Sequence, residues 1–230
     1  MFTFKRFVIH QDRCAMKVGT DGVLLGAWAK GGAHILDIGT GTGLIALMMA
    51  QRYVNATVDA VEIDNDAVEQ AQENVARTEF ADRVRIANVA IQHYSTTKRY
   101  DAIVSNPPFF IDSLHNPDTQ RATARHASTL KYNELFAAVK ALLSSEGEFS
   151  AIIPTECLPM FVGEAYKAGL AMSRRYAIRT TPRKQPKRYL VAFRHQDNHY
   201  ETETAEVCLQ EPDGSRSEWY TQLTADFYIK

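Results

Sequence analysis

The stretch "AHILDIGTGTG", residues 33–43, decides the fold of this chain of 230 residues. An apolar run that contains Asp37 ends in Gly39, Gly41 and Gly43, and the next ten residues have the composition of a helix. Glycine adopts positive φ angles and lets a ligand approach the main chain, beside a helix N-terminus that favours polar or negative groups. The stretch therefore predicts a strand, a ligand-binding turn and a helix.

Strands and helices alternate along the rest of the chain, which predicts a mostly parallel sheet of the α/β class with helices on both faces. Further strands are expected at 56–64, 82–90, 99–106 and 147–154, and helices at 44–53, 65–78, 130–143 and 159–169. Two β-like segments, 170–180 and 187–195, have no helix-length insert between them and predict a terminal antiparallel hairpin. The expected sheet therefore has seven strands.

We expect a single domain in three parts, since a chain of this length can bury an ample core. Residues 1–30 are rich in glycine and predict a loop-rich N-terminal cap, and residues 31–195 form the core. Residues 196–230 hold strand-like pieces around an Asp213-Gly214 turn. They are expected to form a β extension that packs on the sheet edge or continues it.

The composition excludes several classes of protein. Hydrophobic residues make up 45% and charged residues 23% of the chain, as in ordinary globular domains. Cys14, Cys157 and Cys208 are far apart and show no metal-ligand spacing, so we expect buried thiols and neither disulfides nor a metal site. The N-terminus lacks the apolar segment of a signal peptide, and no apolar run spans 18 residues. We therefore expect no membrane partner and a cytoplasmic location.

Charge is unevenly distributed in a chain whose net charge is only −1. Residues 174–194 hold eight Arg or Lys residues and no acid. Such a basic segment favours contact with a polyanion, although it could also be the solvated face of an edge hairpin.

An acid, Glu62, ends the second expected strand, 19 residues beyond Gly43. In open α/β sheets ligands bind at the carboxyl ends of the strands, where such an acid holds ribose hydroxyls. A dinucleotide fingerprint would need glycine in place of Leu44, and no Gly-Lys-Ser/Thr of a Walker loop follows. The pattern therefore argues against NAD and nucleoside triphosphates as ligands of this turn. The alternative to a ligand-binding turn is a glycine turn that binds no ligand.

The motif "SNPPFF", residues 105–110, follows the fourth expected strand. Asn before Pro favours a turn and proline cannot continue a central strand, so the simplest interpretation is a strand-ending turn. Proline also fixes φ and has no N–H donor. The turn can therefore hold the Asn106 side-chain oxygen and the Pro107 carbonyl rigidly as two hydrogen-bond acceptors.

The motifs "ILDIGTGTGLIAL", "VEID" and "SNPPF", in this order and at these separations, resemble those of class I S-adenosylmethionine-dependent methyltransferases of the N6-adenine type. The block "FKRFVIHQDRCAMKVGTDGVLLGAWA" (4–29), with "ARH" (124–126) and "PKRYLVAF" (186–193), resembles the bacterial enzymes that methylate adenine 37 of valine tRNA. This resemblance covers nearly the whole chain and is loosest in residues 195–230. It implies a Rossmann-like fold, S-adenosylmethionine as cofactor, and methylation of the N6 amino group of that adenine, next to the anticodon.

The resemblance also implies roles for particular residues. The catalytic set is expected to accept hydrogen bonds from the adenine amine and to stack on the flipped base; it comprises Asn106, Pro107, Pro108 and Phe109. The alternative role of Phe109 is that of a core aromatic. The cofactor set comprises Lys17, Thr20, Asp21, Asp37, Gly39, Gly41, Gly43, Glu62 and Asn106. Gly19 and Trp28 are expected to join the cap over the methionine end of the cofactor, for which loop packing is the alternative role.

One position departs from the pattern of the relatives, in many of which an acid after the third strand binds the adenine of the cofactor. Here Ala90 stands at that position, with Asn88 and Gln92 nearby, so this contact has no assigned residue. Asp64 is expected to be a helix N-cap and not a ligand-binding acid.

The expected partner is tRNA, bound through its anticodon arm by a monomer without a metal. The expected tRNA-binding residues are Arg125, His126, Arg183, Lys184, Lys187 and Arg188. Arg125 and His126 could equally form a solvated surface pair. Two other functions stay open: N-methylation of another acceptor (an rRNA adenine or a protein glutamine), and a catalytically silent RNA-binding module on the same fold. The intact Asp37, Glu62 and Asn106 argue against the silent module.

Overall fold

The computed structural model describes residues 1–14, 16–108, 130–197 and 201–229, and its centre is an eight-stranded sheet. The strand order is β10-β8-β9-β7-β6-β3-β4-β5, and only β9 runs antiparallel to its neighbours. The strands are β3 (His34–Ile38), β4 (Thr57–Glu62), β5 (Val84–Asn88), β6 (Tyr100–Ser105), β7 (Leu143–Pro154), β8 (Leu170–Arg179), β9 (Arg188–His195) and β10 (Glu203–Cys208). The predicted fold class and the terminal hairpin, β8–β9, are confirmed.

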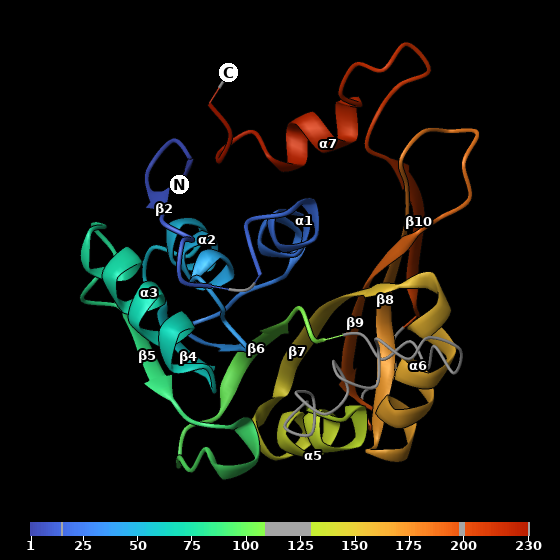
Figure 1. Cartoon of the computed structure of the whole chain (residues 1–230). Coiled ribbons are helices and arrows are strands. Elements are labelled where there is room, and N and C mark those ends of the chain that lie inside the picture. Colours follow the sequence, from blue (N-terminus) through green and yellow to red (C-terminus); the bar gives the residue numbers. More distant parts are fainter. Residues whose placement is uncertain (15, 109–129, 198–200, 230) are drawn as a thin grey trace, which may run out of the picture.

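Helices cover both faces of this sheet (Figure 1). One face carries α1 (Thr20–Trp28), α2 (Leu44–Arg52), α3 (Asn65–Ala76) and α7 (Glu218–Leu223), and the other carries α5 (Tyr132–Leu142) and α6 (Leu158–Lys167). Two short 3-10 turns, Ile91–His93 and Thr155–Cys157, and a two-stranded hairpin of β1 (Phe2–Thr3) and β2 (Val8–Ile9) complete the described elements.

The two cores follow from the alternation of side chains along the strands. On β3, Ile35 packs under α1 and α2, whereas Leu36 and Ile38 pack against α5 and α6. On β6, Val104 and Ile103 divide in the same way. Strands buried on both faces are continuously apolar, and the exception in β3 is Asp37, which is fully buried on the α2 side. A buried acid at the end of a central strand identifies the region where the site lies.

The C-terminal segment differs from the sequence prediction in two respects. First, the sheet has an eighth strand, because β10 pairs in parallel with β8, from Glu203 opposite Arg174 to Cys208 opposite Arg179. The tail therefore continues the sheet. Second, the piece after the Asp213-Gly214 turn is the helix α7 and not a strand.

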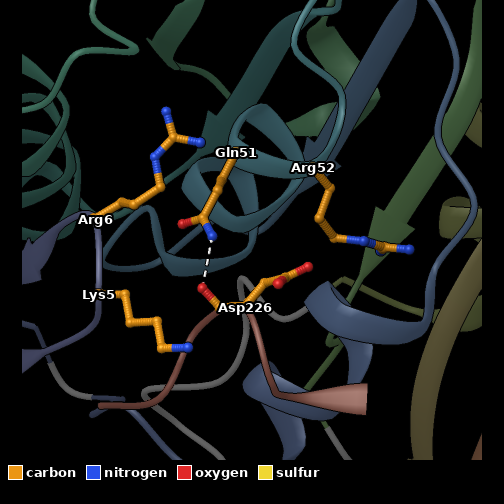
Figure 2. A pocket seen from close by; sticks show the side chains of 5 residues that line it. All are labelled: Lys5, Arg6, Gln51, Arg52 and Asp226. Atoms are coloured by element: carbon orange, nitrogen blue, oxygen red, sulfur yellow. Dashed lines mark hydrogen bonds between the residues drawn. The ribbon is translucent and has the colours of Figure 1, made fainter. Parts of the chain in front are cut away.

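The N-terminal cap is also more regular than a loop-rich segment, since it contains the nine-residue helix α1. Its first residues meet the C-terminal segment at the far end of α2 (Figure 2). The Lys5 main-chain N–H donates to the Phe227 carbonyl at 2.8 Å, and Gln51 Nε2 donates to the Asp226 carbonyl at 2.9 Å. The two ends of the chain are thereby fastened to each other and to α2.

The described residues contain no helix that is long and apolar enough to cross a membrane. In the same ranges, no group of three or more His, Cys, Asp or Glu side chains is arranged to hold a metal ion. The cysteines are free thiols, and Cys14 and Cys157 are buried.

Candidate functional site

The candidate site lies beside β3, where the order in which the chain adds strands to the sheet reverses. Strand β3 pairs with β4 on one side and with β6 on the other, and the chain builds β4 and β5 outward before it returns to β6. All four strands are parallel, so their carboxyl ends share one edge. Ligands of open α/β sheets bind at such a switch point.

The glycine turn at the end of β3 has a main chain that requires glycine. Gly39, Gly41 and Gly43 have φ values of +73°, +55° and +82°, a region that other residues rarely adopt. Main-chain N–H groups of Gly39 and Thr40 both donate to the Val61 carbonyl, at 2.9 and 3.1 Å, and hold the turn against β4. A Cβ atom on Gly39 would meet no atom of the described residues within 4 Å, so this part of the chain leaves the turn open on that side.

Asp37 lies directly under this turn and is 0% exposed. Its Oδ2 accepts hydrogen bonds from Thr40 Oγ1 at 2.7 Å and from the Ala46 N–H at 3.1 Å. Its Oδ1 is buried without a hydrogen-bond partner among the described residues. Burial raises the pKa of Asp37 to about 7, although the Thr40 and Ala46 hydrogen bonds oppose this shift. An unpartnered buried carboxylate oxygen is suited to a donor group of a ligand.

Glu62 stands at the end of β4 and its carboxylate braces the glycine turn. Oε2 accepts from the Gly41 N–H at 3.0 Å, and Oε1 accepts from the N–H groups of Ile63 and Asp64 at 2.7 and 3.1 Å. Because a carboxylate offers about four lone-pair positions, the group keeps capacity for a ribose hydroxyl. Asp64 is confirmed as an N-cap, since it accepts from the Ala67 N–H at 3.0 Å.

Asn106 follows β6 at the neighbouring strand end. Ser105 Oγ donates to the Ile38 carbonyl at 2.9 Å and ties the two strand ends together. The Asn106 Nδ2 group contacts Met16 Sδ at 3.7 Å, and its Oδ1 is buried without a hydrogen-bond partner in the described part of the chain. Pro107 is buried and Pro108 is exposed. The acceptor end of this amide thus has no hydrogen-bond donor among the described residues, and Phe109 lies outside them.

The expected methionine cap is only partly brought together. Lys17 and Thr20 are exposed at the start of α1, and Asp21 forms an ion pair with Arg188 of 2.9 Å. Trp28 lies at the other end of α1 from these residues. There the Arg174 guanidinium is 3.7 Å from the centre of its ring. Eight helical residues separate it from Thr20, a rise of about 12 Å.

The region after β5 offers no acid for an adenine. Asn88 Nδ2 donates to the Glu62 carbonyl at 3.3 Å, and Gln92 Nε2 donates to Glu134 on α5 at 2.9 Å. Ala90 precedes the 3-10 turn of residues 91–93. These amides, the exposed His93 side chain and main-chain groups are among the polar groups that the described residues present here.

The basic segment 174–194 does not present all of its cations to solvent. Half of its eight cations pair with acids: Arg174 and Arg194 with buried Glu148, Arg179 with Glu206, and Arg188 with Asp21. Glu148 and Arg174 are only 3% and 6% exposed, so this pair belongs to the interior.

The exposed cations Arg183, Lys184 and Lys187 lie in the loop between β8 and β9. Because β8 runs in the same direction as β7, this loop emerges at the carboxyl edge of the sheet. Thr155 Oγ1, just beyond β7, donates to the Pro186 carbonyl at 2.7 Å and anchors the loop there. The loop therefore shares the edge that holds Asn106, while Arg125 and His126 lie outside the described residues.

Sequence reasoning missed Met16, which contacts Asn106, and two buried amides on α3, Gln70 and Asn74. The signal for the amides was present, because both fall at positions where the helical period of Ala67, Ala71 and Val75 places buried side chains. No comparable signal marked Met16.

S-adenosylmethionine fits the groups that the site presents. Its ammonium group needs an acceptor, which Asp37 Oδ1, without a partner among the described residues, can supply, and its ribose needs the acid at the end of β4. The open side of Gly39 leaves room for a ligand against the main chain.

Comparison with known proteins gives consistent results. Residues 18–157 match the model of the methyltransferase small domain. A tRNA1(Val) (adenine(37)-N6)-methyltransferase of Phocaeicola vulgatus is 47% identical over 230 residues, which cover 99% of this chain and 97% of the relative. A protein of the same name from Bacteroides fragilis is 46% identical and covers 100% of this chain and 98% of its own. The solved structure of a predicted O-methyltransferase of Agrobacterium tumefaciens shares the fold, with a TM-score of 0.70 at 17% identity over 90% of this chain and 96% of that chain.

Proposed function

This chain belongs to the methyltransferase small-domain family and, within it, to the tRNA1(Val) (adenine(37)-N6)-methyltransferases, and we propose the roles of its residues in that reaction. The enzyme transfers a methyl group from S-adenosylmethionine to the N6 amino group of adenine 37 in valine tRNA. The observation that supports the assignment of roles is the buried Asn106 Oδ1, which has no hydrogen-bond partner among the described residues and follows the strand next to the glycine turn.

Residues at the ends of β3 and β4 would hold the cofactor. Gly39, Gly41 and Gly43 would let it approach the protein main chain, and Asp37 Oδ1 would accept from the amino group of its methionine part. Glu62 accepts from the ribose hydroxyls, and Lys17, Thr20 and Asp21 cap the methionine end. When bound, S-adenosylmethionine supplies an electrophilic methyl group on a positively charged sulfur.

Asn106 and Pro107 prepare the target amine for attack. The lone pair of an adenine amino group is delocalised into the ring, which makes the nitrogen a poor nucleophile. Hydrogen bonds from its two N–H groups to Asn106 Oδ1 and the Pro107 carbonyl favour a tetrahedral nitrogen with a localised lone pair. Transfer of the methyl group from bound S-adenosylmethionine to this nitrogen would break the methyl–sulfur bond, and one amine proton would leave to water. Positioning and electrostatics therefore supply the rate.

The tRNA is held by the β8–β9 loop at the same edge. Exposed Arg183, Lys184 and Lys187 contact phosphates of the anticodon arm while adenine 37 is flipped toward Asn106. Arg188 contributes less than the other cations of the loop, because its guanidinium already pairs with Asp21. The chain acts as a monomer in the cytoplasm, and its parts 1–30, 31–195 and 196–230 work as one domain.

The proposal is tested with total tRNA from a strain that lacks the enzyme. Incubation with purified protein and S-adenosylmethionine should place one methyl group on adenine 37 of valine tRNA, as mapped by mass spectrometry of nuclease fragments. Ribosomal RNA and glutamine-containing protein extracts are incubated in parallel. Methylation of one of these substrates instead would change the acceptor, and a protein that binds tRNA without any transfer would be a silent binding module.

A further inference from the structure

Two amides lie on the buried face of α3 where aliphatic side chains would be expected. Gln70 is 1% exposed and Asn74 is 0% exposed. In the described part of the chain, neither amide forms a hydrogen bond with a strand of the sheet. Both form hydrogen bonds with the N-terminal strap, by which we mean residues 10–14 and 16–18. Burying an amide in a core position is costly unless its hydrogen bonds are satisfied.

Asn74 joins the strap to the glycine turn. Its Oδ1 accepts from the His10 N–H at 2.9 Å, and its Nδ2 donates both to the His10 carbonyl and to the Thr42 carbonyl, each at 2.9 Å. These three bonds use both N–H groups and the oxygen of the amide. If the amide were reversed, its NH2 group would face the His10 N–H donor, and its oxygen would face the His10 and Thr42 carbonyls. The orientation of the amide is therefore fixed by its partners.

The groups that Asn74 connects belong to the strap, through the His10 main chain, and to the glycine turn of the candidate cofactor site, through the Thr42 carbonyl. Thr42 stands between two glycines of the turn and is 4% exposed. The strap continues from His10 to Cys14, whose sulfur would be 3.8 Å from a Cβ on Gly41, and then to Met16, whose sulfur contacts Asn106. The strap therefore covers the glycine turn and ends beside the acceptor amide.

Gln70 supports the same segment more weakly. Its Oε1 accepts from the N–H groups of Asp12 and Arg13 at 3.2 and 3.3 Å. Arg13 also pairs with the exposed carboxylates of Glu69 and Glu73 on α3. The exposed ion pairs contribute little to stability, whereas a buried amide with three bonds fixes position.

We propose that Asn74 is a positioning residue that fastens the N-terminal strap to the glycine turn, so that S-adenosylmethionine binds into a preformed enclosure. This inference rests on the proposed function for the identity of the ligand. Without the three bonds, cofactor binding would have to order the strap, and the ordering would reduce affinity. Asn74 touches neither reacting group, so the methyl transfer itself should be unaffected once the cofactor is bound.

The test compares N74D with E73Q and the wild type. N74D keeps the shape and the acceptor for His10 but places an oxygen against the His10 and Thr42 carbonyls; E73Q removes only an exposed ion pair of the same strap. Hydrogen exchange without cofactor should become about 10-fold faster in residues 10–18 of N74D, with the sheet unchanged. The KM for S-adenosylmethionine should rise about 10-fold, with kcat and the KM for tRNA within about 2-fold. E73Q should match the wild type in strap exchange, in both KM values and in kcat.

Wild-type exchange in the strap of a folded N74D, with an unchanged cofactor KM, would overturn the inference. Thermal unfolding reports whether N74D folds, and if it does not, N74S, which removes the amide without adding a charge, is measured in the same way. A wild-type protein that does not bind S-adenosylmethionine would overturn the proposed function and the cofactor part of this inference. The exchange data would then still decide whether Asn74 fastens the strap.

Discussion

At the scale of single residues, Asn106 has two ends with different surroundings. Its NH2 group contacts the Met16 thioether and its oxygen is buried without a partner in the described residues. A buried acceptor without a donor costs free energy in the ligand-free protein. This cost is consistent with a group that is completed by the substrate amine.

We expect Asn106→Ala to lower the rate of methyl transfer by about 10²- to 10³-fold, the usual effect of removing one hydrogen-bonding group that stabilises a transition state. S-adenosylmethionine affinity should stay within a few-fold, because the acceptor faces the substrate amine. Single-turnover kinetics and calorimetry measure the two quantities, with exposed Asn65→Ala as the control. Near-normal turnover in the Asn106 variant would refute the acceptor role.

Asp37 gives a prediction about pH. Its pKa is raised from 3.8 to about 7 mainly by burial. Between pH 3.8 and about pH 7, Asp37 keeps in the folded chain a proton that it has lost in the unfolded chain. Asp37 therefore makes the free energy of unfolding fall as pH rises through this range, and the full decrease is present above pH 7. In Asp37→Asn, the amide oxygen can keep the Thr40 and Ala46 bonds.

The melting temperature of ligand-free Asp37→Asn, relative to the wild type, should therefore increase between pH 5 and pH 8. Thermal unfolding across this range measures it, and exposed Asp66→Asn controls for the loss of a negative charge. Cofactor affinity should fall in the same variant, since an NH2 group then faces the ligand amino group. A difference in melting temperature that stays flat with pH would show that Asp37 does not titrate in this window.

At the scale of elements, the hairpin β8–β9 shows that a sequence pattern predicts strands better than it predicts which charged side chains are exposed. The segments 170–180 and 187–195 predicted the two strands correctly, because β-rich runs without a helix between them form a hairpin. The sequence pattern could not predict which cations remain exposed. Arg174 pairs with a carboxylate 26 positions away and Arg188 with one 167 positions away, and such partners depend on sheet register.

Two other elements show the same limit. The helix α7 has only six residues, and its Trp, Tyr and Thr favour strands. It forms because Ser217 accepts from the Tyr220 N–H at 3.1 Å and Tyr220 packs into the core. Trp28 was assigned to the site by motif alone, whereas the helical geometry of α1 carries it to the opposite end. The strand ends with Asp37, Glu62 and Asn106 were predictable because parallel strands share a carboxyl edge.

The exposed part of the hairpin loop gives a third prediction. Changing Lys184 and Lys187 together to Ala should weaken tRNA binding and reduce the slope of log affinity against log salt by about two, one for each lost phosphate contact. Cofactor binding should be unchanged. Filter binding at several salt concentrations measures the slope, and Arg85→Ala with Arg99→Ala removes the same charge from exposed positions elsewhere. If the loop variant kept the wild-type slope, tRNA would dock on another surface.

At the scale of the whole molecule, the two ends of the chain close over the face of the sheet that carries α1 and α2 (Figure 1). Phe227 is 1% exposed and packs in the core of that face, and its carbonyl accepts from the Lys5 N–H. The sequence placed this segment only as an extension, because no local pattern links residue 227 to residue 5. The contact joins the C-terminal segment to the β1–β2 hairpin, which leads directly into the N-terminal strap.

Phe227→Ala should therefore lower the free energy of unfolding by about 3–5 kcal/mol, the range for removing a buried ring from a core that relaxes only partly. The contact lies at the far end of α2 from the glycine turn, so kcat should be retained at temperatures where the variant is folded. Denaturant titration measures the change. Ile229→Ala is the matched control, since Ile229 is 57% exposed in the same segment and should change stability by less than about 0.5 kcal/mol. Equal effects of the two substitutions would mean that the C-terminal segment is not fastened through the Phe227 ring.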